Sequence, residues 1–413
     1  MSDFDLAIVG AGIVGVSAAL WAAKRGQKVV LIDPMPPGSG TSSGNACTVA
    51  TYGCLPVNDP SVLVGLPRLV LGGDSPLSMR WSYALRNPGW MLRFLANCRS
   101  GPSQRIATQL AELLANADAG LNPLIEEAGA EDLIVARGQI TIWSTEKAAE
   151  GAEAGLQRRR DLGVEWAELT PEEARKSEPG LTLSIARAVH FPLARHIRDP
   201  EILVQRFHRR FEALGGETLT QKAHSVEQIG SDMVINSGVG AVSARRVVIA
   251  AGAFSRGIKG AGICKLPLGT ERGYHVVYES EADRVTRPVG WAEGGFYAVP
   301  MAKGLRLAGT VEIAGLDASS NPERLAYLQR RGAEMLGDLP LPTGTWLGYR
   351  PTMPDSLPVI GYAPGTDRII HAFGHQHLGL TLGGITGRLV ADLAEGRQPN
   401  MDISGLSAGR RFS

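Results

Sequence analysis

Residues 4–15 read Phe-Asp-Leu-Ala-Ile-Val-Gly-Ala-Gly-Ile-Val-Gly, and residues 28–33 read Lys-Val-Val-Leu-Ile-Asp. The apolar, β-prone residues 4–9 predict a buried parallel strand. Residues 13–25 have the periodicity of a helix that stops at Gly26, and residues 28–32 predict a second strand that ends at an acid. This order of strand, glycine turn, helix, strand and acid predicts an α/β domain built on a parallel sheet.

The three glycines of this turn have distinct tasks in binding a dinucleotide. Gly10 permits the tight turn, Gly12 lets a pyrophosphate approach the backbone, and Gly15 lets the helix pack against the strand. The helix that begins at Ile13 and Val14 offers unpaired N–H groups and the positive end of its dipole to the phosphates. These residues therefore predict a Rossmann-like site for a dinucleotide, either FAD or NAD.

An acid and a polar loop follow the second strand. Asp33 stands eighteen residues after Gly15, where a carboxylate can accept a hydrogen bond from a ribose hydroxyl and disfavours the 2′-phosphate of NADP. After Pro34 the chain continues into a loop of small and hydroxyl-bearing residues, which could close over the pyrophosphate or flavin; a plain surface linker is the alternative. The loop residues concerned are Thr41, Ser42, Ser43, Gly44, Asn45 and Ala46.

Size and composition restrict the class of protein. The chain has 413 residues, a net charge of +1 and 4 cysteines. Its length predicts two domains or closely joined lobes, and its net charge gives no reason to expect nucleic acid as a partner. We expect no metal site, because no two cysteines have Cys-x-x-Cys spacing, and no transmembrane helix, because no stretch of about eighteen apolar residues occurs. Because the first strand begins at residue 4, we also expect no signal peptide and a cytoplasmic location, with peripheral contact at the inner membrane face left open.

Later stretches extend this pattern. Residues 246–250 form another apolar strand, and Ala251-Gly252 follows it, which suggests that the chain returns to the nucleotide-binding domain. Residues 272–310 are rich in β-formers and could form the antiparallel sheet of a second domain. Residues 47–103 are irregular and bear aromatic side chains, so either a lid over the substrate or ordinary packing of a second lobe could account for them.

Four separated segments together resemble one family. They are the glycine unit, Val-Ile-Ala-Ala-Gly at 248–252, Gly-Tyr-Arg-Pro at 348–351 and Gly-His-Gln-His-Leu-Gly at 374–379. The chain resembles the D-amino acid oxidase superfamily of FAD-dependent oxidoreductases over nearly its whole length, most of all its bacterial D-amino acid dehydrogenase branch. The resemblance implies a Rossmann-like FAD-binding domain (1–85, 150–265 and 345–413) and a substrate domain on a mixed or antiparallel sheet (86–149 and 266–344).

The resemblance also implies roles for individual residues. Arg350 matches the arginine that binds the substrate carboxylate, a task for which a planar guanidinium is suited, although a structural ion pair is the alternative. Tyr274 aligns loosely with a tyrosine near that carboxylate, and Tyr52 is a candidate for a lid; both could instead be packing residues. The implied cofactor contacts beyond the glycine unit and its loop are Val226 on the adenine side, Ala251 and Gly252 in a third turn, and Gly374, His375, Gln376, His377, Leu378, Gly379, Leu380 and Thr381 around the flavin.

The implied reaction is dehydrogenation of a D-amino acid, with hydride passing from the substrate Cα to FAD. No cysteine stands in a context that resembles covalent flavin attachment, so we expect noncovalent FAD. A cyclic substrate such as D-proline or hydroxy-D-proline is one hypothesis. The alternatives are a related flavoenzyme that acts on glycine, sarcosine or a 2-hydroxy acid, and a flavin-binding subunit without turnover. The sequence leaves the oligomeric state and the electron acceptor open, whether quinone, carrier protein or oxygen.

Overall fold

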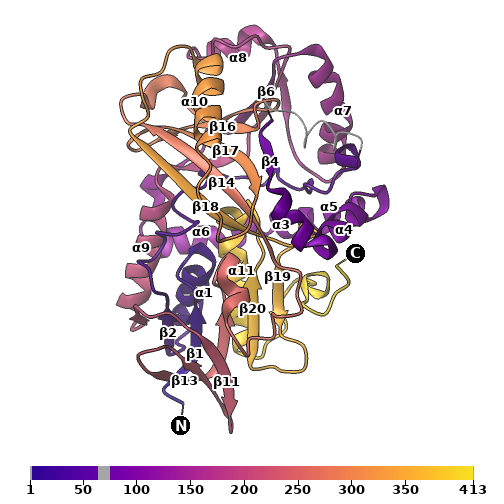
Figure 1. Ribbon diagram of the computed structural model, residues 1–413. Helices are drawn as coiled ribbons and strands as arrows, with labels where there is room; N and C mark the ends of the chain where they lie inside the picture. Colours follow the sequence, from indigo (N-terminus) through magenta and orange to yellow (C-terminus); the bar gives the residue numbers. More distant parts are fainter. Residues whose placement is uncertain (1, 64–74, 413) are drawn as a thin grey trace.

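The chain folds around two large β-sheets (Figure 1). The computed structural model describes residues 2–63 and 75–412. An 8-stranded sheet occupies the lower half of the view and a 9-stranded sheet the upper half, with a 3-stranded sheet in addition. The predicted α/β fold is confirmed.

The 8-stranded sheet contains the N-terminal unit. Strands β10, β2, β1, β13 and β20 lie side by side and run parallel, so that the chain crosses over through helices on its way between them. A meander of β13, β12 and β11 extends it, and β19 pairs antiparallel with β20. Its strands are β1 (Phe4–Val9), β2 (Val29–Ile32), β10 (Glu217–Leu219), β11 (Ser225–Ile229), β12 (Asp232–Asn236), β13 (Ala241–Ile249), β19 (Val359–Tyr362) and β20 (Ile369–Phe373).

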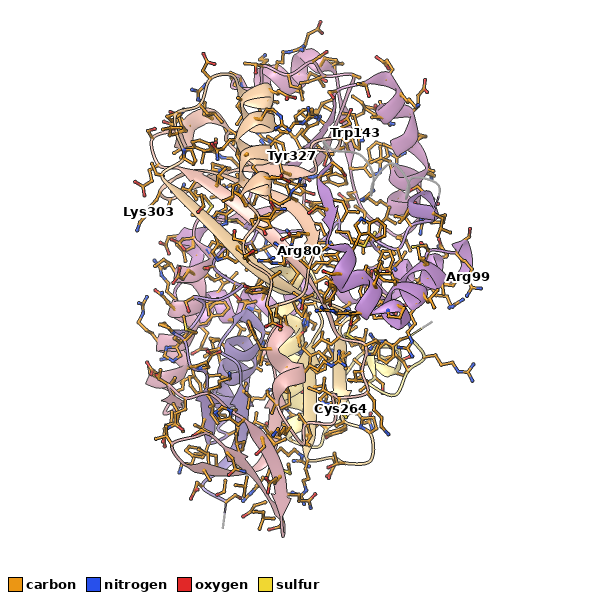
Figure 2. The ribbon with its side chains drawn as sticks, viewed as in Figure 1. Arg80, Arg99, Trp143, Cys264, Lys303 and Tyr327 are labelled. Carbon is orange, nitrogen blue, oxygen red and sulfur yellow. The ribbon has the colours of Figure 1, made fainter. Side chains whose placement is uncertain are left out.

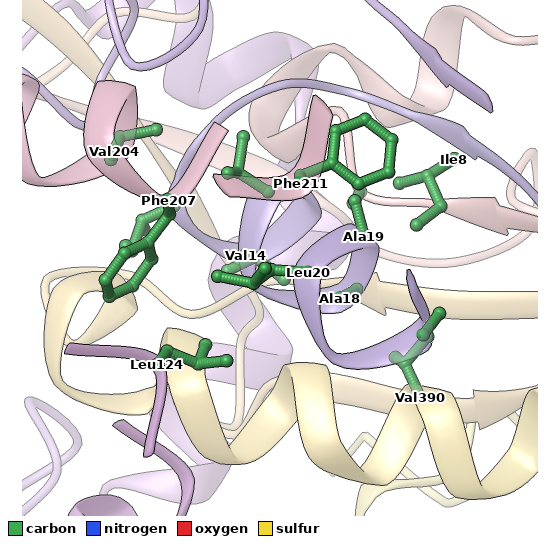
Figure 3. Close-up of a cluster of buried hydrophobic side chains, with 14 of the residues drawn as sticks. Ile8, Val14, Ala18, Ala19, Leu20, Leu124, Val204, Phe207, Phe211 and Val390 are labelled. Carbon is green, nitrogen blue, oxygen red and sulfur yellow. The ribbon is translucent and has the colours of Figure 1, made fainter. Parts of the chain in front are cut away.

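Helix α1 (Ile13–Lys24) is the centre of the largest apolar cluster. Figure 3 shows Val14, Ala18 and Leu20 of α1 among side chains from three other helices. The glycine and alanine content of these helices allows close approach: a Cβ on Gly387 would lie 2.6 Å from the backbone of Ser17. The neighbouring helices are α6 (Ala117–Glu127), α9 (Pro200–Ala213) and α11 (Gly379–Ala394).

The 9-stranded sheet is mainly antiparallel. Its order is β18-β14-β17-β16-β15-β6-β8-β7, with β4 paired to β17 and helix α10 (Pro322–Leu336) packed on β14 and β17. Its strands are β4 (Leu77–Met79), β6 (Gln139–Trp143), β7 (Ala167–Leu169), β8 (Arg187–Phe191), β14 (Gly269–Tyr278), β15 (Val289–Trp291), β16 (Phe296–Met301), β17 (Gly304–Ile313) and β18 (Gly344–Thr352).

The remaining elements surround these sheets. The 3-stranded sheet is β3 (Thr48–Val49), β9 (Arg195–Ile197) and β5 (Ile134–Val135). The other helices are α3 (Trp81–Arg86), α4 (Pro88–Asn97), α5 (Ser100–Ala115), α7 (Glu146–Asp161) and α8 (Pro171–Ser177), with short 3-10 turns η1 (Glu131–Leu133), η2 (Gly252–Gly257), η3 (Ala282–Arg284) and η4 (Ser404–Leu406). Within the described ranges, no helix is long and apolar enough to cross a membrane.

Some local expectations need correction. Residues 47–103 are not irregular throughout, since α3, α4 and the start of α5 fall there; residues 64–74 of that segment lie outside the described residues. The proposed domain boundaries stay a prediction, but sheet membership differs from them. Strands β7 and β8 belong to the 9-stranded sheet, although 150–265 was assigned to the FAD-binding domain. Helix α6 packs on α1 and α11, although 86–149 was assigned to the substrate domain. Short strands and helices carry no local signal of which sheet they will join.

Candidate functional site

The glycine turn after β1 requires glycine at two positions. Gly10 has a φ of +114°, and a Cβ there would lie 2.5 Å from the carbonyl oxygen of Ala250 at the end of β13. A Cβ on Gly15 would lie 1.8 Å from the carbonyl oxygen of Gly10. The turn therefore brings α1, β1 and β13 together more closely than any side chain would allow.

The N-terminus of α1 is open to an anion. Its N-cap, Gly12, supplies no side-chain hydrogen bond, and the first turn contains no acidic residue. The N–H of Ile13 donates to Ser42 Oγ at 2.9 Å, whereas the N–H groups of Val14 and Gly15 donate to no acceptor in the described part of the chain. Unpaired amides at the positive end of a helix dipole suit the pyrophosphate of a dinucleotide.

Asp33 lies beside this turn, at the end of β2. Its Oδ2 accepts from the N–H of Ala11 at 2.7 Å, and its Oδ1 accepts from the N–H of Met35, just after Pro34, at 2.8 Å. The carboxylate remains partly accessible. It is therefore fixed in place with acceptor capacity left for a ribose hydroxyl.

The loop that follows is held by the 9-stranded sheet. Thr41 Oγ1 donates to the carbonyl oxygen of Tyr349 on β18 at 3.0 Å. Arg306 Nη1 on β17 donates to the carbonyl oxygens of Ser43 and Asn45, both at 2.9 Å. Ala46, next in the chain, is half-buried. Because these contacts join the loop to the second sheet, the linker alternative does not describe it.

An aromatic pair supports the same loop. The imidazole of His275 on β14 donates through Nδ1 to the carbonyl oxygen of Gly44 at 3.0 Å and stacks on Trp346 of β18 with a centroid separation of 5.1 Å. Burial, with the charge of Arg306, lowers the pKa of His275 to about 3, so the ring is neutral at pH 7. A Cβ on Gly44 would lie 2.2 Å from the Trp346 ring, which explains the glycine at this position.

The segment before α11 lies beside β18. Gln376, at a φ of +49°, donates its N–H to the carbonyl oxygen of Pro351 at 2.9 Å. His375 Nε2 pairs with Thr386 Oγ1 at 2.9 Å, and burial lowers the pKa of His375 to about 3. Thr381 Oγ1 accepts from the N–H of Ala50 at 2.9 Å. Among the residues that the structure describes, no side chain caps α11, whose N-terminus includes Leu378, Gly379 and Leu380 and follows Gly374 (φ +88°).

Arg350 lies on the face of β18 that is turned toward this segment. Its guanidinium lies over Gly273 of β14, where a Cβ would be 2.4 Å from Nη2. Nη1 donates to the carbonyl oxygen of Thr310 at 3.1 Å, and among the described residues Nε and Nη2 have no hydrogen-bond partner. Arg350 thus presents two unpaired donors, as bidentate binding of a carboxylate requires.

Two neighbours contribute to the charge around Arg350. Glu271 on β14 stands opposite Arg350 on β18 in the register of the two strands, and the two side chains form no ion pair. His377 keeps part of its surface open to solvent. Desolvation by the neighbouring protein, together with the positive charge of Arg350, lowers the pKa of His377 to about 4. His377 is therefore neutral at pH 7, and Arg350 is the cation of this group.

Tyr274 is not brought together with Arg350. Since Glu271 is the partner of Arg350, residues 271 and 273 share its face, and Tyr274 points to the other face of the sheet. There its hydroxyl donates to Glu312 Oε2 at 2.5 Å and accepts from the N–H of Asn321 at 3.1 Å. Arg80, labelled near the middle of the molecule in Figure 2, lies 3.6 Å from the same carboxylate. Tyr274 is thus a packing residue, one of the two interpretations left open by the sequence.

Tyr52 packs within an apolar cluster against the 9-stranded sheet. Its ring stacks on Phe191 of β8, with centroids 4.4 Å apart, and it is buried. Burial, with a hydrogen bond to Tyr297, raises its pKa well above the usual range. Its hydroxyl therefore stays protonated.

The remaining predicted contacts are dispersed. Ala251 and Gly252 (φ +54°) follow β13 next to the first glycine turn, because the N–H of Ala250 donates to the carbonyl oxygen of Val9. Val226 lies in β11 with its side chain in the core, and its N–H already donates to the carbonyl oxygen of Lys259. Its adenine contact remains a prediction.

Sequence reasoning missed several residues of this region. They are Glu271, Gly273, His275, Arg306 and Trp346, all on the face of the 9-stranded sheet that bears Arg350. The alternation of β14 places the first three on one face, but only its pairing with β18 shows that this is the face of Arg350.

Comparison with known proteins is consistent with this geometry. The family described as DAO, FAD dependent oxidoreductase, matches residues 5–393. A D-amino-acid oxidase of Bradyrhizobium diazoefficiens is 34% identical, over 98% of each chain. A D-amino acid dehydrogenase of Granulibacter bethesdensis is 28% identical, over 98% of each. The crystal structure of glycine oxidase from Geobacillus kaustophilus superposes with a TM-score of 0.76 at 24% identity, over 99% of each chain.

The open end of α1, the two obligatory glycines and the fixed carboxylate of Asp33 all fit the pyrophosphate and ribose of FAD. The family match spans nearly the whole chain. The chain therefore belongs to the DAO family of FAD-dependent oxidoreductases.

Proposed function

We propose that this FAD-dependent oxidoreductase dehydrogenates a D-amino acid. The observation that carries the proposal is the guanidinium of Arg350, which lies beside the segment before α11 with Nε and Nη2 unpaired by any residue that the structure describes. Because Arg350 is only half-buried, these donors stay accessible to an anionic ligand. The carboxylate of an amino acid fits these two donors.

The residues of the chain would act mainly by positioning. Arg350 binds the carboxylate in one orientation, while Gly273 lets the guanidinium lie flat against β14. His377, kept neutral by its surroundings and by Arg350, does not compete for the carboxylate as a second cation would. FAD, when bound, would supply the acceptor for the hydride of the substrate Cα, and the imino acid would hydrolyse or, if cyclic, persist.

The D configuration is supported by the relatives. The curated relatives at 34% and 28% identity are named as D-amino acid oxidase and D-amino acid dehydrogenases. A cyclic substrate such as D-proline or hydroxy-D-proline is one candidate within this proposal.

Two other functions compete with this proposal. The same arginine could bind glycine, sarcosine or a 2-hydroxy acid; an L-proline dehydrogenase from P. horikoshii shares the fold with a TM-score of 0.72. A flavin-binding subunit without turnover would not need the unpaired donors of Arg350. We also propose noncovalent FAD in a cytoplasmic enzyme, with quinone, carrier protein or oxygen as candidate acceptors.

Anaerobic mixing of the FAD-loaded protein with single compounds tests the proposal. The compounds are D- and L-amino acids including both prolines, hydroxy-D-proline, glycine, sarcosine and 2-hydroxy acids, and the absorbance of the oxidised flavin is followed. We expect D-amino acids to bleach it, and L-enantiomers to do so far more slowly. Bleaching by 2-hydroxy acids alone, or by none of these compounds, would contradict the proposal.

A further inference from the structure

Glu271 is a buried carboxyl group that the proposed reaction has not yet used. It lies on β14 directly opposite Arg350, only 7% exposed, so both side chains project from the same face of the sheet. Directly opposed residues of an antiparallel pair have Cβ atoms roughly 5 Å apart. A buried carboxylate therefore lies next to the proposed site of the substrate carboxylate.

Glu271 has no direct partner in the described part of the chain. It forms no hydrogen bond and no ion pair there, and its interaction with Arg350 is electrostatic only. Arg350 leans over Gly273 instead and donates to Thr310. Since buried polar groups are nearly always paired, a carboxyl group left without a partner points to a ligand with donor groups.

A second unpaired polar atom lies on the same face. A Cβ on Gly269, two residues before Glu271 on β14, would lie 2.8 Å from Nε1 of Trp90 of α4. That nitrogen is buried and has no hydrogen-bond partner among residues 2–63 and 75–412. This face of β14 thus carries an unpaired donor, an unpaired acceptor and Arg350, a combination suited to a zwitterion.

From this juxtaposition we infer that Glu271 binds the amino group of the substrate while Arg350 binds its carboxylate. The inference rests on the proposed function and narrows its substrate class to amines. An ammonium group supplies the donors that Glu271 lacks, and an α-amino acid carries this cation next to its carboxylate. A 2-hydroxy acid offers a single neutral donor and brings no cation to Glu271.

Glu271 would also take the proton that blocks the reaction. The ammonium form cannot give an imine until one N–H proton leaves, and that proton moves to a carboxylate oxygen of Glu271. Loss of this proton to Glu271 would free the nitrogen lone pair to form the C=N bond as the Cα–H bond breaks, with bound FAD supplying the two-electron acceptor. Burial raises the pKa of Glu271, opposed by Arg350, which makes it a stronger base than an exposed glutamate.

The test compares ligands with and without an amino group. Wild-type protein, Glu271→Gln and Glu271→Asp are loaded with FAD and titrated with D-alanine, D-lactate and propionate, with flavin absorbance reporting binding and reduction. For Glu271→Gln we expect D-alanine to bind about 10- to 100-fold more weakly and to reduce the flavin more slowly, since a charged hydrogen bond is lost. Propionate, which needs only Arg350, should bind equally or more tightly. Glu271→Asp should fall between Glu271→Gln and the wild type for D-alanine.

The outcomes separate this inference from the proposed function. Equal weakening of D-alanine and propionate, or unchanged D-alanine reduction, would overturn the role of Glu271 while leaving D-amino acid oxidation intact. Wild-type protein whose flavin no amino acid reduces would overturn the proposed function itself. If Glu271→Gln loses its FAD or its fold, the wild-type protein alone tests the inference. It should bind D-alanine at least tenfold more tightly than D-lactate. Equal affinity for the two would overturn the inference.

Discussion

The turn at Gly10–Gly15 and the face of β14 and β18 that bears Arg350 differ in how far apart in the chain their contacting residues lie. The first is built from residues close in the chain, and its atoms meet because a strand, a turn and a helix follow one another. The second joins Glu271 to Arg350 across strands nearly eighty residues apart. We infer that the local unit binds the cofactor and that the non-local face selects the substrate, so changes in the two regions should have separable effects.

The largest expected effect is that of Gly15→Ala. The new Cβ would lie 1.8 Å from the carbonyl oxygen of Gly10, and because backbone cannot yield as a side chain can, the turn must open. Overpacking of this kind costs about 3 kcal/mol, so FAD should bind about 100-fold more weakly or not at all. FAD titration followed by flavin fluorescence measures this. Gly40→Ala, whose Cβ would meet nothing within 4 Å, is the control and should bind FAD normally.

A smaller and more selective effect is expected of Gly273→Ala. Its Cβ would lie 2.4 Å from Nη2 of Arg350, so the guanidinium must move away from β14. Amino acids should then bind about 10- to 100-fold more weakly, from a loss of roughly 1.5–3 kcal/mol in charged hydrogen bonds, while FAD affinity is kept. Stopped-flow reduction over a range of amino acid concentrations measures this. Gly344→Ala on β18, with its Cβ 3.8 Å from Val277, should behave as wild type; loss of FAD in Gly273→Ala would contradict the separation.

The last effect concerns stability against pH, and per pH unit it is smaller than the losses expected above. Burial lowers the pKa of His375 and of His275 to about 3, from 6.5 in the unfolded chain. The unfolded chain therefore binds more protons below pH 6.5, and each histidine reduces the free energy of unfolding as pH falls from 6.5 toward 3; above pH 6.5 neither contributes. The slope is at most about 1.4 kcal/mol per pH unit for each histidine.

Substituting these histidines would show whether the two regions unfold together. His375→Asn and His275→Asn should each reduce the pH dependence of the free energy of unfolding between pH 4 and 6.5. The reduction should be at most about 1.4 kcal/mol per pH unit, the value for one proton, as measured by denaturant titration. Similar flattening in both would indicate one cooperative unit. A change for only one of them would show that the sheets lose structure separately.

The same division between local and non-local contacts decided which features could be predicted from the sequence. The roles proposed for Gly10, Gly15 and Asp33 depended on neighbours within thirty residues; the structure shows the close backbone approaches at both glycines and places Asp33 beside the turn, while its ribose contact stays a prediction. The strands predicted at 4–9 and 28–32 rested on local apolar runs in the same way, and they are β1 (Phe4–Val9) and β2 (Val29–Ile32) of the structure.

The substrate side could not be predicted with the same security. Tyr274 was chosen although it lies on the face opposite Arg350, because a one-residue difference along a strand reverses the direction of the side chain. Glu271 was overlooked, since nothing in its own neighbourhood shows that β18 will pair beside it. Such information lies in the register between distant strands, which a single sequence does not state.

The most direct measurement compares Arg350→Leu with wild-type protein in two titrations, one with FAD and one, anaerobic, with the D-amino acid that reduces the wild type best. Loss of a buried charged partner costs about 3 kcal/mol or more, so reduction at low substrate concentration should slow at least about 100-fold, while FAD affinity changes by less than about twofold. Arg245→Lys, at an exposed surface position, serves as the control. Retained reduction by Arg350→Leu, or a parallel loss of FAD binding, would contradict the assignment of cofactor and substrate to separate regions.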